Sequence, residues 1–260
     1  MTDNAARVSA SRLGLWVAPA TAAVGVVSLV VSVSTPVRSG PWCNDGCVAY
    51  PYTDVAAFVP RDYLWIYPQV LLVLLLVLLF VLLFVLLAVC LLHWVPPQRR
   101  LSAAVAVCFA VIGAAVLVVD YGIQLTVLQP AVLSGQTEGM SALTMYDPRG
   151  VFIALENVGY AVFGVAFVFL GGALAGASSR RERAVHWVFI VGGVLILAAL
   201  VLSAAIYRAD LDYWFELMSL SITWLVLIVS GTLLTVVFGR GRKVATQHPP
   251  AITTDALAGR

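Results

Sequence analysis

Six stretches of the chain are long and almost purely apolar, and short polar segments separate them. They run from about Leu13 to Val33, Tyr67 to Val95, Leu101 to Leu128, Gly150 to Ala177, Ala184 to Tyr207 and Leu211 to Phe238. A helix needs roughly 20 mostly apolar residues to cross the hydrocarbon layer of a bilayer. The pattern therefore predicts an all-α, polytopic bundle of six transmembrane helices (residues 13–238), with outer loops at about 34–66 and 129–149.

The basic residues predict how this bundle is oriented. Eleven of the 15 Lys and Arg residues lie before the first helix, between the second and third, between the fourth and fifth, or after the sixth. Cytoplasmic segments carry such an excess of basic residues. We therefore expect both termini in the cytoplasm, with a short N-terminal segment (1–12) and a tail (239–260) whose basic and Pro-rich sequence favours disorder.

Composition agrees with a membrane protein and excludes two other classes. Hydrophobic residues make up 62% of the chain and charged residues 11%, against about 25% charged in soluble domains. A soluble enzyme of this length could not bury so much apolar surface. The net charge of +2, with no basic face, argues against a nucleic-acid partner. Membrane lipid is the expected surrounding, and protein partners stay unknown.

The first apolar stretch has a second interpretation. Basic residues precede it, and Val31-Ser32-Val33-Ser34 resembles a weak signal-peptide cleavage site. However, the apolar part of a secretory signal usually spans about 7–15 residues, which favours an uncleaved first helix. Cleavage would leave five helices with an outer N-terminus.

Two helices stand out by their side-chain size. The second has almost only Leu, Val and Phe from Val70 to Leu92. Small residues allow helices to approach closely in membranes, so this helix is expected to face lipid over much of its surface. Glycines recur along the fourth (Gly159, Gly164, Gly171, Gly172 and Gly176). Gly172 and Gly176 have the small-xxx-small spacing of close helix packing, which favours packing within the chain over dimerisation.

Acidic and aromatic side chains concentrate on the predicted outer side. Ten acids but only four arginines lie there, a formal charge of −6. All nine tyrosines also lie on this side, whereas an aromatic belt normally uses both interfaces. Such a field attracts cations and repels anions.

Three of these acids fall inside predicted helices at a similar depth. Asp120, Glu156 and Glu216 lie roughly 8–12 Å from the outer helix ends, at 1.5 Å per residue. Ionisable groups in a bilayer usually face a cavity or a partner, and polar neighbours follow at helical spacing. We therefore predict an outward-facing polar pocket lined by Asp120, Gln124, Glu156, Asn157, Tyr160 and Glu216.

A structural alternative explains the same acids. Arg149 could pair with Glu156 or Asp147, and Arg208 could pair with Glu216 or a neighbouring aspartate. The loop at 129–149 is long for a hairpin between neighbouring helices. Its apolar residues suggest that it lies back over the bundle, either as a lid over the pocket or as a short interfacial helix.

The cysteines and histidines point to no cofactor. Cys43 and Cys47 lie in the first outer loop, where an oxidising compartment favours a disulfide. The three histidines lie on the inner side and the acids on the outer side. They cannot combine into a zinc site of about three ligands. We therefore expect no metal and no cofactor.

Two stretches resemble a family of bacterial proteins. Asp120-Tyr-Gly-Ile-Gln-Leu-Thr126 and the stretch from Met145 to Glu156 are similar to segments of uncharacterised, small, six-pass bacterial integral membrane proteins. The resemblance covers most of the third to sixth helices. It implies that the two stretches form one unit, and it implies no activity, substrate or cofactor. The bias toward Val, Ala and Arg over Ile and Lys indicates a GC-rich bacterium, so we expect a bacterial cytoplasmic (inner) membrane location.

Three functions fit these observations. The first is binding or transport of a small cationic or amphipathic molecule at the acidic and aromatic pocket. The second is a membrane-embedded enzyme that uses a carboxyl group as general acid on a lipid or isoprenoid. The third is an accessory subunit of a membrane complex. The substrate, the coupling ion and the oligomeric state stay open.

Overall fold

The fold is a bundle of six long helices, as the hydropathy pattern predicts. The computed structural model describes residues 3–34, 43–44, 47, 68–128, 130–131, 134–136, 138–208, 211 and 213–247, and no strand occurs in these ranges. The helices are α1 (Asp3–Ser34), α3 (Pro68–Trp94), α4 (Arg100–Ile123), α6 (Val151–Ala173), α7 (Arg180–Tyr207) and α8 (Trp214–Gln247). All six contain a segment that is long and apolar enough to cross a membrane.

Several helix ends differ from those expected from hydropathy. α1 begins at Asp3 and α8 continues to Gln247, beyond the predicted limits of Leu13 and Phe238. A hydropathy window detects only the apolar part of a helix. Extending an existing helix into polar sequence costs little free energy, because nucleation is the unfavourable step. α6 ends at Ala173, because the chain turns at Gly176 with a positive φ of 74°. The expected tail from 248 lies outside the described residues.

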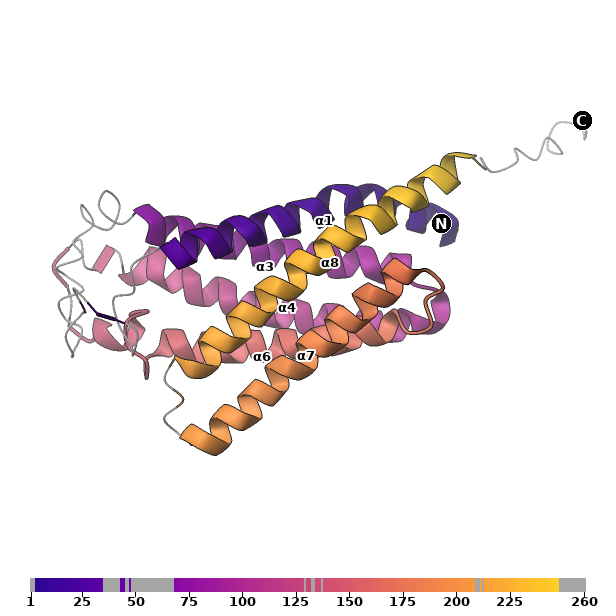
Figure 1. Ribbon diagram of the computed structural model, residues 1–260. Coiled ribbons are helices and arrows are strands. Elements are labelled where there is room, and N and C mark those ends of the chain that lie inside the picture. Colours follow the sequence, from indigo (N-terminus) through magenta and orange to yellow (C-terminus); the bar gives the residue numbers. More distant parts are fainter. Residues whose placement is uncertain are drawn as a thin grey trace, which may run out of the picture.

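The helices form a closed ring around a packed interior (Figure 1). In order, α1 packs against α3, α3 against α4, α4 against α6, α6 against α7, α7 against α8, and α8 against α1. α6 also touches α8 across the ring. This extra contact matters for function, because it brings α4, α6 and α8 together.

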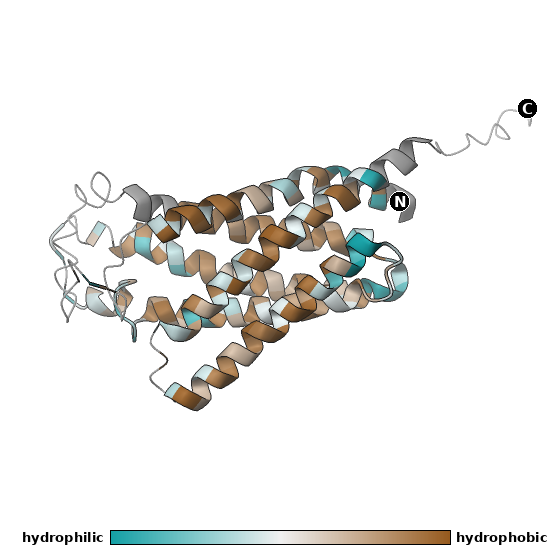
Figure 2. Ribbon diagram, in the orientation of Figure 1, coloured by the Kyte–Doolittle hydropathy of each residue, from teal (hydrophilic) through white to brown (hydrophobic). Residues whose placement is uncertain are grey.

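Polar residues collect at the two ends of the bundle, and the middle is apolar (Figure 2). α1 begins and α8 ends at the same end (Figure 1), which we call the arginine-rich end because Arg99, Arg180, Arg181 and Arg183 lie there. We call the opposite end, with the turn 138–150, the loop end. That the arginine-rich end faces the cytoplasm stays a prediction.

The second apolar helix is more enclosed than expected, although a row of its leucines (Leu75, Leu79, Leu82 and Leu86) is exposed. More of α3 is buried than of any other span, and Phe80 and Phe84 are almost fully enclosed. The ring of Phe84 lies 4.8 Å from that of Phe163 and 5.0 Å from that of Phe167, between centroids. Phe80 occupies the space beside Gly25 of α1. The small residues that permit this packing belong to the neighbouring helix, so the composition of α3 alone does not show it.

Glycines of α6 allow close packing within the chain, as expected, but not at the expected pair. A Cβ on Gly159 would meet Leu117 of α4 at 2.6 Å, and one on Gly171 would meet Ile190 of α7 at 2.6 Å. A Cβ on Gly172 would meet only the hydroxyl oxygen of Ser102, at 3.3 Å, and Gly176 lies in the turn after α6. The close approach of α4 to α6 therefore occurs at Gly159, near the predicted site.

A network of polar side chains joins three helices at the arginine-rich end. Ser179 caps α7: its hydroxyl accepts from the backbone N–H of Glu182 (3.1 Å) and donates to Oε2 of Glu182 (2.7 Å). The other Glu182 oxygen accepts from Trp94 Nε1 of α3 (2.9 Å). The guanidinium of Arg7 of α1 lies 4.6 Å from the centre of the Trp94 ring.

Replacing Ser179 with alanine is expected to destabilise the protein by about 1 kcal/mol, because an N-cap side chain satisfies a free N–H at the helix start. For a protein of this size the melting temperature should fall by about 2–4 °C, measured by circular dichroism in detergent. Ser178→Ala, at the exposed neighbouring position, is the matched control. Equal melting temperatures for the two variants would contradict the capping role.

Candidate functional site

Three acids from three helices meet inside the loop end of the bundle. Asp120 of α4 and Glu156 of α6 are only 1% and 2% exposed, and Glu216 of α8 is half-buried. Glu156 interacts electrostatically with Asp120, and its side chain also interacts with that of Glu216. The structure thus brings together the three carboxyl groups that were expected to share one place.

Two tyrosines complete this group. The hydroxyl of Tyr121 donates to Oε1 of Glu156, and its oxygen lies 3.1 Å from the hydroxyl oxygen of Tyr160. Tyr160 also interacts electrostatically with all three acids. We call Asp120, Tyr121, Glu156, Tyr160 and Glu216 the carboxyl–tyrosine cluster.

Close packing of α4 on α6 positions the cluster. Leu117 of α4 packs against Gly159 of α6, and the ring of Phe163 of α6 packs against Gly113 of α4. Because glycine has no side chain, the two helices approach closely about one turn below the carboxyl groups. Aromatic rings then enclose the tyrosines. Phe152 lies 5.6 Å from Tyr121, and Phe163 lies 6.3 Å from Tyr160, between ring centroids. The cluster is therefore shielded from water on the α4–α6 side.

Several buried oxygens at this level have no hydrogen-bond partner among the described residues. They include Oδ2 of Asp120, Oδ1 of Asn157, Oγ of Ser203 and Oγ1 of Thr223. Hydroxyls in helices commonly bond to the carbonyl three or four residues earlier, as that of Ser219 does, but those of Ser203 and Thr223 do not. Unpaired buried polar groups are costly, so these oxygens are candidates for contact with a ligand.

Asn157 lies beside the cluster rather than in it. The packing of Gly164 against Ile196 and of Gly171 against Ile190 defines an antiparallel register between α6 and α7. Continued toward the loop end, this register places Asn157 opposite Ser203. Both residues carry an unpaired oxygen, so a polar position lies at the α6–α7 interface next to the cluster.

Gln124 holds the loop rather than lining a free surface. It begins a π-helical turn, η3 (Gln124–Leu128), at the end of α4. Its Nε2 donates to the carbonyl of Leu143 (2.6 Å), and its Oε1 accepts from the N–H of Met145 (3.3 Å). Leu143 ends a 3₁₀ helix, η4 (Met140–Leu143). Both ends of the amide are therefore occupied by loop backbone.

The described part of the loop lies back over the bundle, as expected. Thr144 is fully buried and Tyr146 is 7% exposed. The hydroxyl of Tyr213, just before α8, donates to the carbonyl of Tyr146 (2.7 Å). The loop is thus attached to both α4 and α8, above the cluster. Its role as a lid stays a prediction.

Replacing Gln124 with leucine is expected to loosen residues 140–147, because two backbone groups of the loop lose their partner. A hydrogen bond contributes about 1 kcal/mol, so the loop amides should exchange hydrogen roughly tenfold faster, in line with reduced local stability. Hydrogen–deuterium exchange in detergent measures this rate. Gln136→Leu, at an exposed position of the same loop, should leave it unchanged. Equal exchange rates in both variants would contradict the conclusion that Gln124 holds the loop.

The structure gives Glu156 a tyrosine partner, because its Oε1 accepts from the hydroxyl of Tyr121. The backbone N–H of Arg149 donates to Oδ1 of Asp147 (3.0 Å), which closes the turn before α6. Arg208 is exposed at the end of α7, with a positive φ of 57°. The alternative in which these two arginines pair with the acids stays a prediction.

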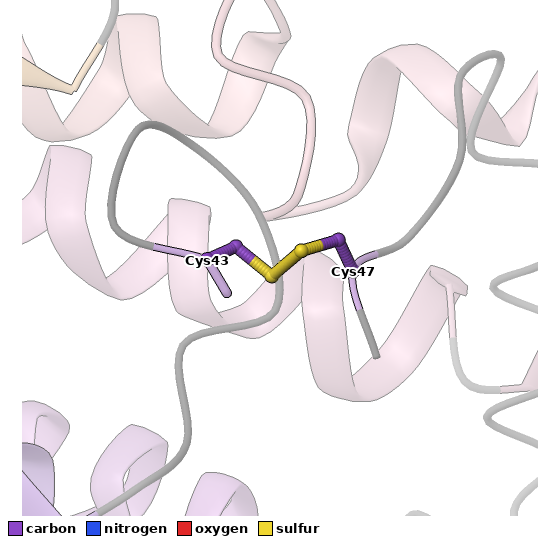
Figure 3. The surroundings of a disulfide bond; sticks show 2 residues. All are labelled: Cys43 and Cys47. Carbon is purple, nitrogen blue, oxygen red and sulfur yellow. A yellow bond between two sulfur atoms is a disulfide. The ribbon is translucent and has the colours of Figure 1, made fainter. Parts of the chain in front are cut away.

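Cys43 and Cys47 form the expected disulfide, with their sulfur atoms 2.01 Å apart (Figure 3).

Within the part of the chain that the structure describes, no three His, Cys, Asp or Glu side chains are grouped so that they could hold a metal ion.

Tyr121 is the main site residue that sequence reasoning missed. Asp120 is recognisable from sequence as an acid within an apolar helix. Tyr121 is one of nine tyrosines on the predicted outer side, and residue type alone did not distinguish it from the others. The spacing of Gly113, Leu117 and Gln124, all on the inner face of α4, was a usable signal, because Tyr121 lies on that face. Buried tyrosines usually bond through their hydroxyl.

No family model, no curated protein and no solved structure matches the chain. The resemblance of the segments around Asp120 and Glu156 to uncharacterised bacterial membrane proteins stays a prediction.

Proposed function

We propose that this protein binds a small organic cation at the carboxyl–tyrosine cluster and carries it across the membrane. The observation that carries the proposal is the meeting of three acids from three helices inside an apolar bundle, where Asp120 and Glu156 are buried and Glu156 accepts a hydrogen bond from Tyr121. Acidic side chains inside a membrane mark ion and substrate pathways.

The composition of the cluster favours an organic cation over a bare metal ion. The three acids are not grouped as ligands of one metal. Carboxylates attract positive charge, and tyrosine rings attract it through their negative faces. A cation with an apolar body suits both the acids and the surrounding rings of Phe152 and Phe163.

Glu216 is the member of the cluster from which a ligand would enter. Asp120 and Glu156 are enclosed, whereas Glu216 is half-buried. In Figure 1 the end of α7 near Tyr207 diverges from α6. Its side chains there are open to the surroundings: Val201 is 66% exposed and Ile206 is 68% exposed. An amphipathic cation dissolved in the lipid could therefore approach Glu216 beside α7.

The test compares two ions of similar size and opposite charge. The protein is placed in lipid nanodiscs, and binding of radiolabelled tetraphenylphosphonium and tetraphenylborate is measured by equilibrium dialysis, with empty nanodiscs subtracted. We expect saturable binding of the phosphonium cation and none of the borate anion. Proteoliposomes should then show uptake of the cation above that of protein-free vesicles. Equal binding of both ions, or binding of neither, would overturn the proposal.

A further inference from the structure

Four buried oxygen atoms in and beside the carboxyl–tyrosine cluster have no hydrogen-bond partner among the described residues, and they share one chemical property. They are Oδ2 of Asp120, Oε2 of Glu156, Oδ1 of Asn157 and Oγ of Ser203. Carboxylate and amide oxygens can only accept hydrogen bonds, and a hydroxyl can accept as well as donate. The groups that would satisfy this part of the bundle are therefore hydrogen-bond donors.

Asp120 and Glu156 lie opposite each other on two antiparallel helices. Leu117 of α4 packs against Gly159 of α6, and about one turn further toward the loop end this register pairs Asp120 with Glu156. The bond from the hydroxyl of Tyr121 to Oε1 of Glu156 crosses the same interface. Asp120 is 1% exposed and Glu156 is 2% exposed, so both unpaired carboxyl oxygens lie inside the bundle.

Two independent helix contacts place Ser203 of α7 at the same level. The register between α6 and α7 puts it opposite Asn157. On the other side of α7, a Cβ on Gly192 would collide with Val226 of α8. Counting the same number of residues toward the loop end on both helices puts Ser203 opposite Phe215. Ser203 is 1% exposed and Phe215 is fully buried, so the unpaired hydroxyl is enclosed where α6, α7 and α8 meet.

The two tyrosines of the cluster present oxygen atoms to Glu156. The hydroxyl of Tyr121 donates to this carboxyl, and its oxygen lies 3.1 Å from the hydroxyl oxygen of Tyr160. The rings of Tyr121 and Phe152 pack edge to face, at an interplanar angle of 73°. Sites for quaternary ammonium groups instead surround the cation with aromatic ring faces. The surroundings of Glu156 therefore suit a cation that donates hydrogen bonds.

We infer that the cation is a protonated amine with several N–H groups, and that the site prefers a primary ammonium ion to a quaternary one. The inference rests on the proposed function and names its substrate class. A primary ammonium carries three donors, which suffice for Oδ2 of Asp120, Oε2 of Glu156 and one of the oxygens of Asn157 and Ser203. A quaternary ammonium has the same charge but no donor. It leaves these oxygens unpaired, at a cost in binding free energy.

The experiment compares three aromatic amines that differ only in methylation of the nitrogen: 2-phenylethylammonium, its dimethyl form and its trimethyl form. At about pH 7 all three are cations, since alkyl amines titrate near about pH 10. Binding to the wild-type protein in lipid nanodiscs is measured by equilibrium dialysis, with empty nanodiscs subtracted. One hydrogen bond to a charged group corresponds to about tenfold in affinity. We therefore expect the dimethyl form to bind about tenfold, and the primary form about 100-fold, more tightly than the trimethyl form.

The dimethyl form separates hydrogen bonding from size, because it is almost as large as the trimethyl form but keeps one N–H group. Equal affinities of the primary and trimethyl forms, or tighter binding of the trimethyl form, would overturn the inference and leave the proposed function intact. Equal affinities of the dimethyl and trimethyl forms would indicate selection by size and overturn it as well. Absence of saturable binding of all three amines would instead remove the proposed function.

Asp120→Asn tests whether the N–H groups bond to Asp120. Asparagine keeps the shape but replaces one carboxyl oxygen with a donor, so the ligand loses one acceptor. The ratio of the affinities of the primary and trimethyl forms should fall from about 100 to about ten. Glu138→Gln, at an exposed position of the loop, should keep the ratio. Loss of charge alone weakens both cations equally, so an unchanged ratio in a folded Asp120→Asn variant would overturn the assignment to Asp120.

Discussion

Glu156→Gln is expected to weaken binding of tetraphenylphosphonium at least about 100-fold. Glu156 is the centre of the cluster: it accepts a hydrogen bond from Tyr121 and interacts with Asp120 and Glu216. Removing one member of a buried charge pair costs about 2–5 kcal/mol, and about 2.7 kcal/mol corresponds to a factor of 100. Glutamine has nearly the same shape as glutamate and can still accept a hydrogen bond from Tyr121. The loss of affinity therefore reports the contribution of the negative charge of Glu156.

The control for this variant is Glu138→Gln in the exposed part of the loop. It removes the same formal charge from the same end of the molecule but lies outside the cluster, so binding should change less than about twofold, since exposed charges are screened by salt. Melting temperatures of both variants in detergent should stay close to that of the wild type. A folded Glu156→Gln variant with wild-type affinity would contradict a cation site at the cluster.

Gly193→Ala is expected to produce the largest loss of stability from a single methyl group. A Cβ at Gly193 of α7 would lie 2.6 Å from the carbonyl oxygen of Gly164 and 2.9 Å from the backbone nitrogen of Val168, both on α6. Backbone atoms cannot move aside as a side chain can, so the two helices must separate. Overpacking of this kind costs about 1–3 kcal/mol, and the melting temperature should fall by about 5–10 °C.

The comparison for Gly193→Ala is Gly122→Ala near the end of α4. No heavy atom lies within 4 Å of a Cβ at Gly122, and alanine favours a helix over glycine by about 1 kcal/mol. This variant should be as stable as the wild type or slightly more stable in thermal unfolding followed by circular dichroism. A Gly193→Ala protein that melts with the wild type would show that α6 and α7 are not in direct backbone contact.

The same two helices carry the unpaired oxygens of Asn157 and Ser203. Their register depends on the close contact at Gly164 and Gly193. A variant that separates α6 from α7 would therefore disturb the side of the cluster next to Glu156. Reduced cation binding in Gly193→Ala would be expected for this reason and would not by itself identify a ligand-contacting residue.

The number of helices and the grouping of the acids could be predicted from sequence. Length and hydropathy define a membrane-crossing helix almost independently of its neighbours, and TM-length apolar segments recur at all six predicted places. Asp120, Glu156 and Glu216 stood out because an acid in an apolar helix is rare and needs a reason. Their common depth followed from counting residues at a fixed rise per residue.

Helix neighbours and hydrogen-bond partners could not be predicted in this way. The burial of α3 depends on Gly25 and on the rings of Phe163 and Phe167, which belong to other helices. Gln124 was expected at a pocket wall, but its amide bonds to Leu143 and Met145, because the loop folds back over α4.

Composition and the periodicity of single segments are enough to predict six apolar helices, the asymmetry of charge between the two ends, and the depth of the buried acids. The contacts of α6 with both α4 and α8 and the bond from Tyr121 to Glu156 are visible only in the folded structure. These features depend on which helix faces are pressed together, and that follows from the fit of large side chains beside glycines on different helices.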